Sequence, residues 1–519
     1  MFNVLHAKST DLNQLGYHFI KGLLPRHWYQ FADDAAIVTA MESNNQILLN
    51  KFSRWCTWCD MLIRVDKCYS FGIRKENNRS QQVKPMLFIN NLLVKAIDIG
   101  QSFVYLGKHF DFEMKDSEHK NILLDKFKHL MEEIDKLPLH PKHKIQLYQR
   151  YVLSKISWHF TVTNISQTWV KQNLDNILSS FIRSWFGIPI SGTLDFTTLS
   201  KKYFGLNIIM TSSKFIQCQV TFRKNLKNSI NPDIKKIFND TQKEQNIQYD
   251  SYCSTREALK AIRKKTATDA AAKLTTQKLV MSSIWEFADE KFTKYWYKAL
   301  DKLPRGIYSF VIRYLNNTLP NASNTFKWKI STSPFCPNCN LLQSLGHVVS
   351  GCSISLNEKR YNWRHDSFLL NLASIIPRNP LTSLYCDIPG FSSPSIVTGE
   401  RYRPDMIIRK GNILWLIELT IGFETNILKN LQRKREHYRI LIDDLKNRYE
   451  KVNFVNLSLG ACGVFGKDSN LDLLLRDLGL SRQKISYNIS KLSNNCIRTT
   501  YYIFCCRNKD WSNPELLSW

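Results

Sequence analysis

Two adjacent acidic residues, Asp33 and Asp34, have the chemistry of ligands for a hard metal ion. They interrupt an otherwise apolar and aromatic run, Y-Q-F-A-D-D-A-A-I-V-T, that begins at Tyr29. This pattern predicts two short strands joined by a tight turn, with both carboxylates at its tip. Because unpaired carboxylates are costly to bury, we expect them to face solvent or a cation such as Mg²⁺, which takes oxygen ligands. An Asp-Asp turn that only ends a strand is the alternative.

A second acidic pair, Asp405 and Glu418, belongs to two apolar runs separated by a turn near Gly411. The runs predict a β-hairpin in which positions 405 and 418 are opposite each other. Glu418 stands among leucine and isoleucine residues, where a carboxylate is costly unless it meets a cation. Both carboxylates could therefore reach one metal ion, and metal-assisted hydrolysis of a phosphodiester needs such a pair together with a lysine.

A third group has the spacing C-x2-C-x7-H-x4-C. Its members are Cys336, Cys339, His347 and Cys352. Four soft ligands within 17 residues predict a tetrahedral Zn²⁺ site. With every position filled by protein, the zinc should supply folding energy or assist nucleic-acid binding rather than catalyse a reaction. Just beyond, Arg364 and His365 predict either a contact with nucleic acid or the start of a helix.

The composition favours a partner with many negative charges. Among 519 residues, 72 Lys and Arg stand against 44 Asp and Glu, a net charge of +28, which attracts nucleic acid or an anionic membrane surface. No apolar run is long enough for a membrane span, and we find no signal peptide. Thirteen unevenly spread cysteines argue against a secreted disulfide framework and favour a reducing compartment, the nucleus or the cytoplasm.

Helical spacing of apolar residues starts near Glu118 and predicts one helix that ends before Pro138 and another that begins at Pro141. The residues expected to face inward are Leu123, Phe127, Leu130, Met131, Ile134, Ile145, Tyr148, Val152 and Ile156. Those expected to face outward are Lys142, Lys144, Arg150 and Lys155. The outward cations either track a phosphate backbone or form a solvated face.

Three motifs follow one another: F-A-D-D ending at Asp34, V-D-K-C containing Lys67, and F-V-Y-L-G ending at Gly107. In this order they resemble the second half of the reverse-transcriptase palm of non-LTR retrotransposons. The resemblance implies that Asp33 and Asp34 hold catalytic Mg²⁺, that Lys67 lies near the incoming nucleotide, and that the Y-L-G hairpin grips the primer. Nucleotidyl transfer is mostly positioning and metal-borne charge stabilisation, which suits these groups.

The resemblance is incomplete at its start. In the family, a further metal-binding aspartate and a template-holding segment lie on earlier strands, whereas only 32 residues precede Asp33 here. The single acid among them, Asp11, lies in a polar stretch and is not expected to be the missing metal ligand. We therefore expect the chain to be the C-terminal part of a longer retrotransposon protein that does not polymerise alone.

The Asp405 and Glu418 pair is similar to the P-D…(D/E)-x-K pattern of restriction-like endonucleases, with Thr420 at the lysine position. In the endonucleases of non-LTR elements this lysine is displaced onto the following helix. The resemblance therefore implies a lysine within residues 430–440, where we expect Lys434. The alternatives are Lys429 and Arg433, and Glu424 is a candidate additional acid. A C-C-H-C knuckle between polymerase and endonuclease also matches the family.

The predicted fold is multidomain α+β. Residues 1–115 form a partial palm, 116–230 a helical thumb-like region, 231–330 a basic helical connector, 331–366 the zinc knuckle, and 367–519 an α/β restriction-like nuclease domain. The predicted function is nicking of target DNA with Mg²⁺ or Mn²⁺ and binding of element RNA, with RNA-directed DNA polymerase activity lost. The alternatives are a non-catalytic nucleic-acid-binding relic and a reverse transcriptase completed by another chain.

Overall fold

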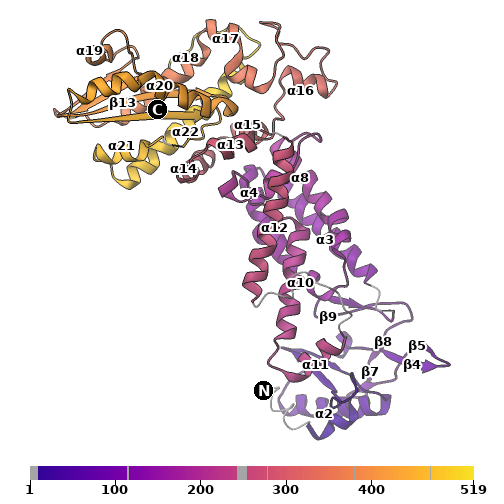
Figure 1. Cartoon of the computed structure of the whole chain (residues 1–519). Helices are drawn as coiled ribbons and strands as arrows, with labels where there is room; N and C mark the ends of the chain where they lie inside the picture. The colour runs from indigo at the N-terminus through magenta and orange to yellow at the C-terminus, as the bar shows by residue number, and fades with distance from the viewer. Residues whose placement is uncertain are drawn as a thin grey trace. The chain divides into compact units, whose positions relative to one another are not determined.

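The computed structural model describes residues 10–113, 116–241, 254–277, 279–378, 380–467 and 469–518. The chain contains both helices and strands and divides into two compact units (Figure 1). The first unit comprises Met1–Ile134, Arg150–Ile177 and Thr211–Ile262, and the second comprises Asp135–Gln149, Leu178–Met210 and Arg263–Trp519. None of the helices in the described ranges combines the length and the apolar composition that a membrane span requires.

Short strand pairs make up much of the N-terminal part of the first unit. The pairs are β1 (Trp28–Phe31) with β2 (Asp34–Ile37), β3 (Tyr69–Ser70) with β8 (Lys95–Ala96), β4 (Gly72–Glu76) with β5 (Arg79–Val83), β6 (Phe88–Ile89) with β7 (Leu92–Leu93), and β9 (Phe103–Tyr105) with β10 (Lys108–Phe110). Helix α2 (Glu42–Trp58) contacts β6. Leu87, Ile89 and Val94 form a small core here.

Helices form the rest of the first unit. They are α3 (Ser117–Lys136), α5 (Leu153–Ser157), α6 (His159–Val162), α7 (Gln167–Val170), α10 (Thr211–Lys227), α11 (Pro232–Thr241) and the start of α12 (Thr255–Thr276). Every side chain that helical spacing predicts to face inward, from Leu123 to Ile156, is buried. The apolar periodicity therefore identified the packed faces correctly.

The prediction that Lys144 faces outward is wrong. Helix α4 (Pro141–Leu147) begins at Pro141, as predicted, but Lys144 is only 5% exposed. Its Nζ atom donates to the backbone carbonyl oxygen of Asp135, 2.6 Å away, near the C-terminal end of α3. The last carbonyl groups of a helix have no partner within it and attract cations. Lys144 therefore caps α3 and is not placed to contact nucleic acid.

A four-stranded sheet organises the second unit. Its strand order is β11 (Thr382–Cys386), β12 (Met406–Lys410), β13 (Ile413–Gly422) and β14 (Lys451–Gly460). Strand β12 pairs with β11 and with β13 in antiparallel orientation, and β13 pairs with β14 in parallel orientation. Because parallel neighbours need a crossover connection, the chain passes from β13 to β14 through helix α20 (Ile427–Lys446).

Alternation along the strands divides the side chains of the sheet between two faces. On one face, Tyr438 and Leu441 of α20 pack against strand residues such as Leu416. The other face is covered by α18 (Arg360–Ile375), α21 (Leu471–Asp477) and α22 (Arg482–Cys505). Further helices of this unit are α8 (Asn176–Phe186), α9 (Asp195–Thr198), α13 (Val280–Phe287), α14 (Glu290–Leu300), α15 (Arg305–Leu315), α16 (Ala322–Lys327), α17 (Ser353–Asn357) and α19 (Ser395–Thr398).

Candidate metal centre and carboxylate site

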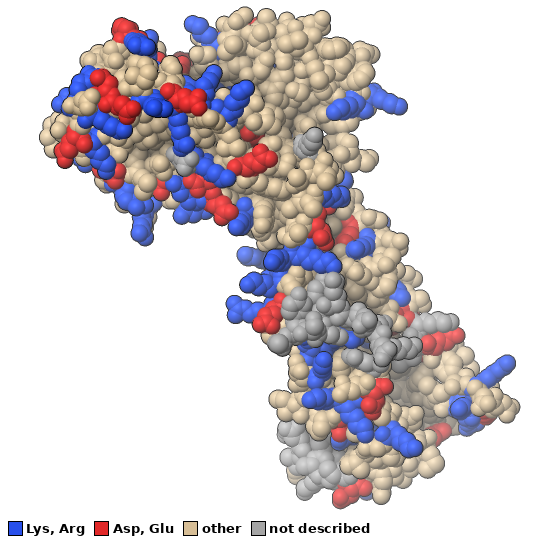
Figure 2. All heavy atoms as spheres, in the orientation of Figure 1, with Lys and Arg blue, Asp and Glu red and all other residues tan. Residues whose placement is uncertain are grey.

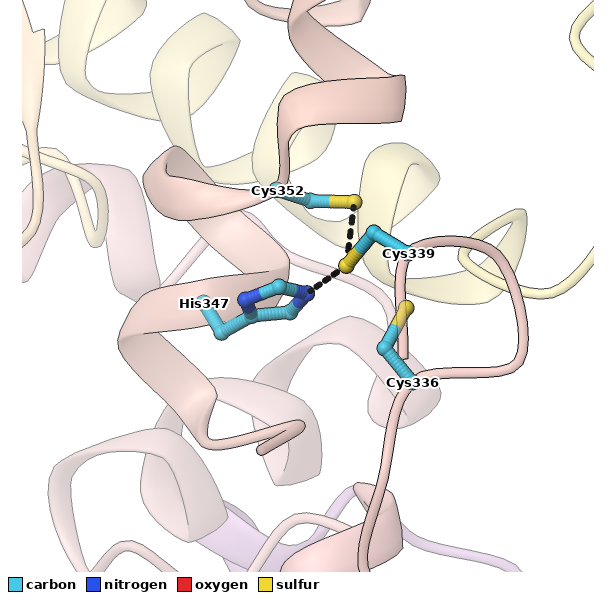
Figure 3. Close-up of side chains that lie close together, drawn as sticks. All are labelled: Cys336, Cys339, His347 and Cys352. Carbon is cyan, nitrogen blue, oxygen red and sulfur yellow. Dashed lines mark hydrogen bonds between the residues drawn. The ribbon is translucent and has the colours of Figure 1, made fainter. Parts of the chain in front are cut away.

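The four predicted zinc ligands come together in the second unit, where Cys336, Cys339, His347 and Cys352 converge (Figure 3). Their ligand atoms all lie within 4.8 Å of one another. The Cys339 Sγ atom is 3.3 Å from His347 Nε2 and 3.8 Å from Cys352 Sγ. Among the described residues, no other group of three or more His, Cys, Asp or Glu side chains is close enough to hold a metal ion. The prediction of a Cys3His centre that could hold Zn²⁺ is confirmed.

A tight turn presents the first two cysteines. The Asn340 N–H donates to the Cys336 carbonyl at 2.9 Å, and Asn340 adopts a left-handed φ of 58°, which asparagine tolerates better than most residues. Burial raises the pKa of the Cys336 thiol, but the backbone N–H groups of Cys339 and Asn338 hold that pKa below its ordinary value. Because the thiolate is the form that binds metal, the turn prepares Cys336 for Zn²⁺.

A π-helical turn, His347–Gly351, presents the other two ligands, since His347 begins it and Cys352 follows it. The Tyr361 hydroxyl accepts a hydrogen bond from the Cys352 N–H at 3.1 Å and lies 3.2 Å from the His347 carbonyl oxygen. Tyr361 belongs to α18, which packs on the sheet. The metal centre is therefore anchored to the domain that carries the second acidic pair.

Asp405 and Glu418 lie opposite each other at the open end of the β12–β13 hairpin. Met406 pairs with Ile417, so the adjoining positions 405 and 418 face each other, as predicted. The Leu419 N–H donates to Asp405 Oδ2 at 2.6 Å, and the Asp405 N–H donates to Glu418 Oε2 at 3.4 Å. Glu418 is 1% exposed. The hairpin thus holds two carboxylates side by side where water is largely excluded.

Helix α20 brings a lysine to this pair. Lys434 Nζ forms an ion pair with Glu418 Oε1. Tyr438, one turn later on the same helical face, is buried against the sheet. Lys429 and Arg433 are exposed, and in the described part of the chain no ion pair joins either of them to a carboxylate. Of the three candidate cations, the structure places Lys434 at the site.

The two carboxylates have pKa values pushed in opposite directions. Burial and the negative charge of Asp405 raise the pKa of Glu418 to about 7, although Lys434 opposes the shift. Burial would also raise the pKa of Asp405, but the charge of His365 and the Leu419 N–H hold it below its ordinary value. Pairs of acids separated in this way are typical of sites that bind cations or move protons.

His365, in α18, is a member of this site that the sequence interpretation missed. Its Nε2 atom lies 3.4 Å from Asp405 Oδ1, and its Nδ1 atom lies 3.1 Å from Asp366 Oδ1. Both ring nitrogens face carboxylates, so both carry a proton and the ring is an imidazolium. Burial lowers the pKa of His365, but the charges and hydrogen bonds of Asp405 and Asp366 outweigh that effect and raise it to about 10. In the protein without a divalent metal, His365 therefore neutralises Asp405.

Arg364 does not make the contact that its sequence neighbourhood suggested. It is 1% exposed, and its Nη1 atom donates to Thr500 Oγ1 at 3.2 Å, so it cannot reach nucleic acid. Nor does it start a helix, because α18 begins four residues earlier, at Arg360. One sequence feature could have pointed to His365 as a member of the carboxylate site. This histidine is followed by an acid, Asp366, in a helix whose other face is apolar.

The imidazolium of His365 gives a pH-dependent contribution to stability. Its pKa in the folded protein exceeds the ordinary 6.5, so this contribution is complete below about pH 6.5 and is lost as the pH rises through about 10. His365→Gln should lower the free energy of unfolding more at pH 6 than near pH 10, because it removes the imidazolium that faces Asp405 and Asp366. Urea unfolding of both proteins without Mg²⁺ should show the gap closing toward pH 10.5. A gap that is independent of pH would contradict this assignment.

Asp33 and Asp34 lie at the tip of the β1–β2 hairpin, where Phe31 pairs with Asp34 and Ala32 takes a φ of 53°. Both aspartates are exposed. The expectation of a strand–turn–strand with solvent-facing carboxylates is confirmed. Within the described ranges no side-chain hydrogen bond, ion pair or third potential ligand meets their carboxylates, so their binding of Mg²⁺ stays a prediction.

The other two motifs of the reverse-transcriptase resemblance contain Tyr105 and Lys67. Burial, and after it the charge of Asp34, raises the pKa of Tyr105, which belongs to the Y-L-G hairpin. Lys67 ends a 3-10 turn, Val65–Lys67, and is exposed. Among the described residues, no hydrogen bond or ion pair joins Lys67 to either aspartate of the first hairpin. The roles that the resemblance implies for these motifs stay predictions.

Glu424, the candidate additional acid, is engaged elsewhere. It is 2% exposed, its Oε2 atom accepts from the Tyr314 hydroxyl, and its Oε1 atom accepts from the Cys462 N–H at 3.0 Å. Thr420 stands two residues after Glu418 on β13, and its buried hydroxyl oxygen has no hydrogen-bond partner in the part of the chain that the structure describes. Glu424 is thus part of the core, whereas the Thr420 hydroxyl, two residues after Glu418 on β13, is left without a partner among the described residues.

These features define a protein of mixed helix and strand with a Cys3His cluster that could hold Zn²⁺ and a separate buried carboxylate pair. No protein-family model matches the sequence, and no curated protein matches it. The function therefore has to be inferred from the chemistry of the two sites.

Proposed function

We propose that the chain is a metal-dependent DNA endonuclease of retrotransposon origin, with Asp405, Glu418 and Lys434 as its catalytic residues. The single observation that carries the proposal is the meeting of two facing carboxylates and a lysine at the open end of the β12–β13 hairpin. A mixed sheet with helices on both faces agrees with the expected nuclease domain. The preceding Cys3His centre, which would hold Zn²⁺, agrees with the expected knuckle.

Mg²⁺ or Mn²⁺ suits the residues of this site. Two carboxylates are enough, because Mg²⁺ is usually held by one or two carboxylates, with water and substrate phosphates as the other ligands. The orphaned hydroxyl of Thr420 fits a site that takes up an ion with its waters. When bound by Asp405 and Glu418, the ion would polarise the scissile phosphate and lower the pKa of a bound water.

Each protein group has an environment that suits a role in hydrolysis. Asp405 is held ionised, ready to bind a cation. Glu418 has a pKa of about 7, so it can bind a cation or accept a proton near neutral pH. Lys434, next to Glu418, can stabilise the negative charge that develops on the phosphate. His365 fixes the orientation of Asp405 and is a positioning residue.

Lys434→Gln is expected to reduce the rate of DNA cleavage about a hundredfold, because it removes the cation that faces Glu418. Lys429→Gln, the matched change on the exposed side of the same helix, should leave the rate within about twofold. Single-turnover cleavage of a labelled duplex would measure both. Equal losses in the two variants would show that general basicity, and not a positioned lysine, supports cleavage.

A basic surface supports binding of target DNA and element RNA. Lys and Arg side chains are distributed over both units (Figure 2), in keeping with the net charge of +28. Contacts between cations and phosphates make affinity fall steeply with salt. A non-catalytic relic would show such salt-sensitive binding without cleavage. Incubating the purified protein with supercoiled DNA and Mg²⁺ or Mn²⁺ distinguishes an endonuclease from such a relic. We expect the DNA to be converted to nicked circles, and EDTA to prevent this conversion.

We further propose that the chain alone does not synthesise DNA. Asp33 and Asp34 supply two carboxylates, and the described residues place no third metal ligand beside them, although two-metal nucleotidyl transfer relies on closely spaced ligands. A primer-extension assay with an RNA template is expected to give no product. Template-dependent extension by the purified chain would contradict this.

A reverse transcriptase completed by another chain is the second candidate, because the first unit exposes large apolar side chains. Trp58 is 80% exposed, Leu62 87% and Phe31 67%. Exposed apolar groups in this number favour coverage by a protein partner. If such a partner exists, adding the fingers and first palm segment of a related polymerase in trans should restore primer extension.

A further inference from the structure

A second site is formed in the second unit, at a cleft of about 550 Å³ between the end of α14 and the first turns of α22. On α22, the residues that line it recur at helical spacing, among them Arg482, Ser486 and Ser490. The opposite side of the same helix is anchored in the core through Ile485 and Ile489. The cleft wall is therefore held in place by packing.

The cleft carries an excess of positive charge. Lys298, Lys302 and Arg482 line it, against one acid, Asp301. Lys298 Nζ donates to Ser486 Oγ at 2.7 Å. In the described part of the chain, none of the three cations pairs with a carboxylate. The N-terminal end of α22 adds the positive end of a helix dipole. These groups suit an anionic ligand with several charges.

An aromatic ring stands beside these cations. Tyr487 lines the cleft and is 54% exposed. The Lys302 Nζ atom lies 4.9 Å from the centre of the Tyr487 ring, and Lys491 Nζ lies 6.0 Å from it. Proteins that bind single-stranded nucleic acid combine an exposed aromatic ring with cations that have no carboxylate partner. The bases stack on the ring, and the phosphates contact the cations.

We infer that this cleft binds a short single-stranded segment of DNA or RNA, with a base on Tyr487 and phosphates at Lys298, Lys302 and Arg482. The site is separate from the carboxylate pair, which lies with α20 on the other face of the sheet. The inference therefore does not depend on the endonuclease proposal. It would let the protein hold a strand while a duplex is cut elsewhere.

Fluorescence anisotropy of the full-length chain with a labelled 12-nucleotide oligothymidine tests the inference. Tyr487→Ala should weaken binding at least about fivefold, because stacking of one base on an aromatic ring has a measurable effect of this size or more. Tyr487→Phe, which keeps the ring, should bind within about twofold of the unaltered chain. Thermal unfolding of each variant shows whether it has folded.

The charged groups provide a second, independent readout. The double change Lys302→Gln with Arg482→Gln should reduce the slope of log affinity against log salt by about 1.4, since each phosphate contact on a single strand contributes about 0.7. Lys484→Gln is the matched control, because Lys484 is exposed on the same helix but does not line the cleft. The slope of log affinity against log salt for Lys484→Gln should change by less than about half of the change in the double variant.

Two outcomes would overturn the inference. The first is unchanged affinity in Tyr487→Ala. The second is competition by inorganic triphosphate with equal strength in both the unaltered chain and Tyr487→Ala, which would indicate a phosphate site without a base. Photocrosslinking of a 5-iodouracil oligonucleotide should label the peptide that contains Tyr487. DNA nicking by the same variants is measured in parallel. A failure of the single-strand-binding inference can therefore be distinguished from a failure of the endonuclease proposal.

Discussion

Replacing Cys352 by serine is expected to release zinc from the chain and to unfold the segment around the metal centre. The four ligands converge within 4.8 Å and are presented by a turn and by the π-helical turn His347–Gly351, so zinc should contribute folding energy to this segment. In small zinc-binding peptides that energy is about 10–16 kcal/mol. Loss of one ligand should lower the thermal midpoint of unfolding by at least about 5 °C. Metal analysis and thermal unfolding would measure the two effects.

Cys505→Ser is the matched control, because Cys505 is an exposed free thiol that lies outside the metal centre. It should keep one zinc ion per chain and its thermal midpoint. Hydrogen exchange should rise near Tyr361 in the Cys352 variant only, since the Cys352 N–H donates to that hydroxyl. A Cys352→Ser protein that retains stoichiometric zinc and unaltered exchange would refute the assignment of the centre.

Neutralising either carboxylate of the hairpin should reduce DNA cleavage by at least about a hundredfold. Asp405→Asn and Glu418→Gln keep the size of the side chain but remove the charge that would hold a divalent ion. Binding of DNA at low salt should persist, because it depends on the many cations of the surface. Glu418→Gln should also remove the partner of Lys434, so its cleavage should not recover when the pH is raised.

Asp443→Asn provides the matched control on α20. The Asp443 side chain is 63% exposed and pairs only with Lys446, at 3.0 Å, among the described residues. Exposed pairs contribute little to stability, so this variant should cleave at the rate of the unaltered chain. Single-turnover rates with Mg²⁺, together with filter binding, would compare all three variants. Full cleavage by Asp405→Asn would remove the basis of the endonuclease proposal.

Features that depend on short sequence separation could be predicted from the sequence. The spacing of Cys336, Cys339, His347 and Cys352 is local, and the ligands meet as expected. The turn near Gly411 and the alternation of the strands fixed the hairpin register, which brought Asp405 opposite Glu418. Helical periodicity identified the buried faces of α3 and α4 because it depends only on which residues are apolar.

Contacts between distant elements could not be predicted in the same way. His365 meets Asp405 because α18 packs beside the start of β12, and sequence pattern carries no information about that distance. Lys144 is buried because a neighbouring helix end offers a carbonyl group. The sequence suggests Glu424 as an additional site acid, but its partner Tyr314 is 110 residues earlier in the chain. Each miss concerns a polar group whose partner only the tertiary structure supplies.

The proposed endonuclease activity requires that the carboxylate pair work with a divalent ion that the Cys3His cluster does not hold. The measurement is cleavage of a labelled duplex by the zinc-loaded full-length chain, with and without added Mg²⁺, beside Asp405→Asn from the same preparation. We expect cleavage that requires Mg²⁺ and disappears in the variant while its zinc content stays unchanged. Salt-sensitive DNA binding without cleavage in Mg²⁺ or Mn²⁺ would contradict the proposed function and leave a nucleic-acid-binding protein.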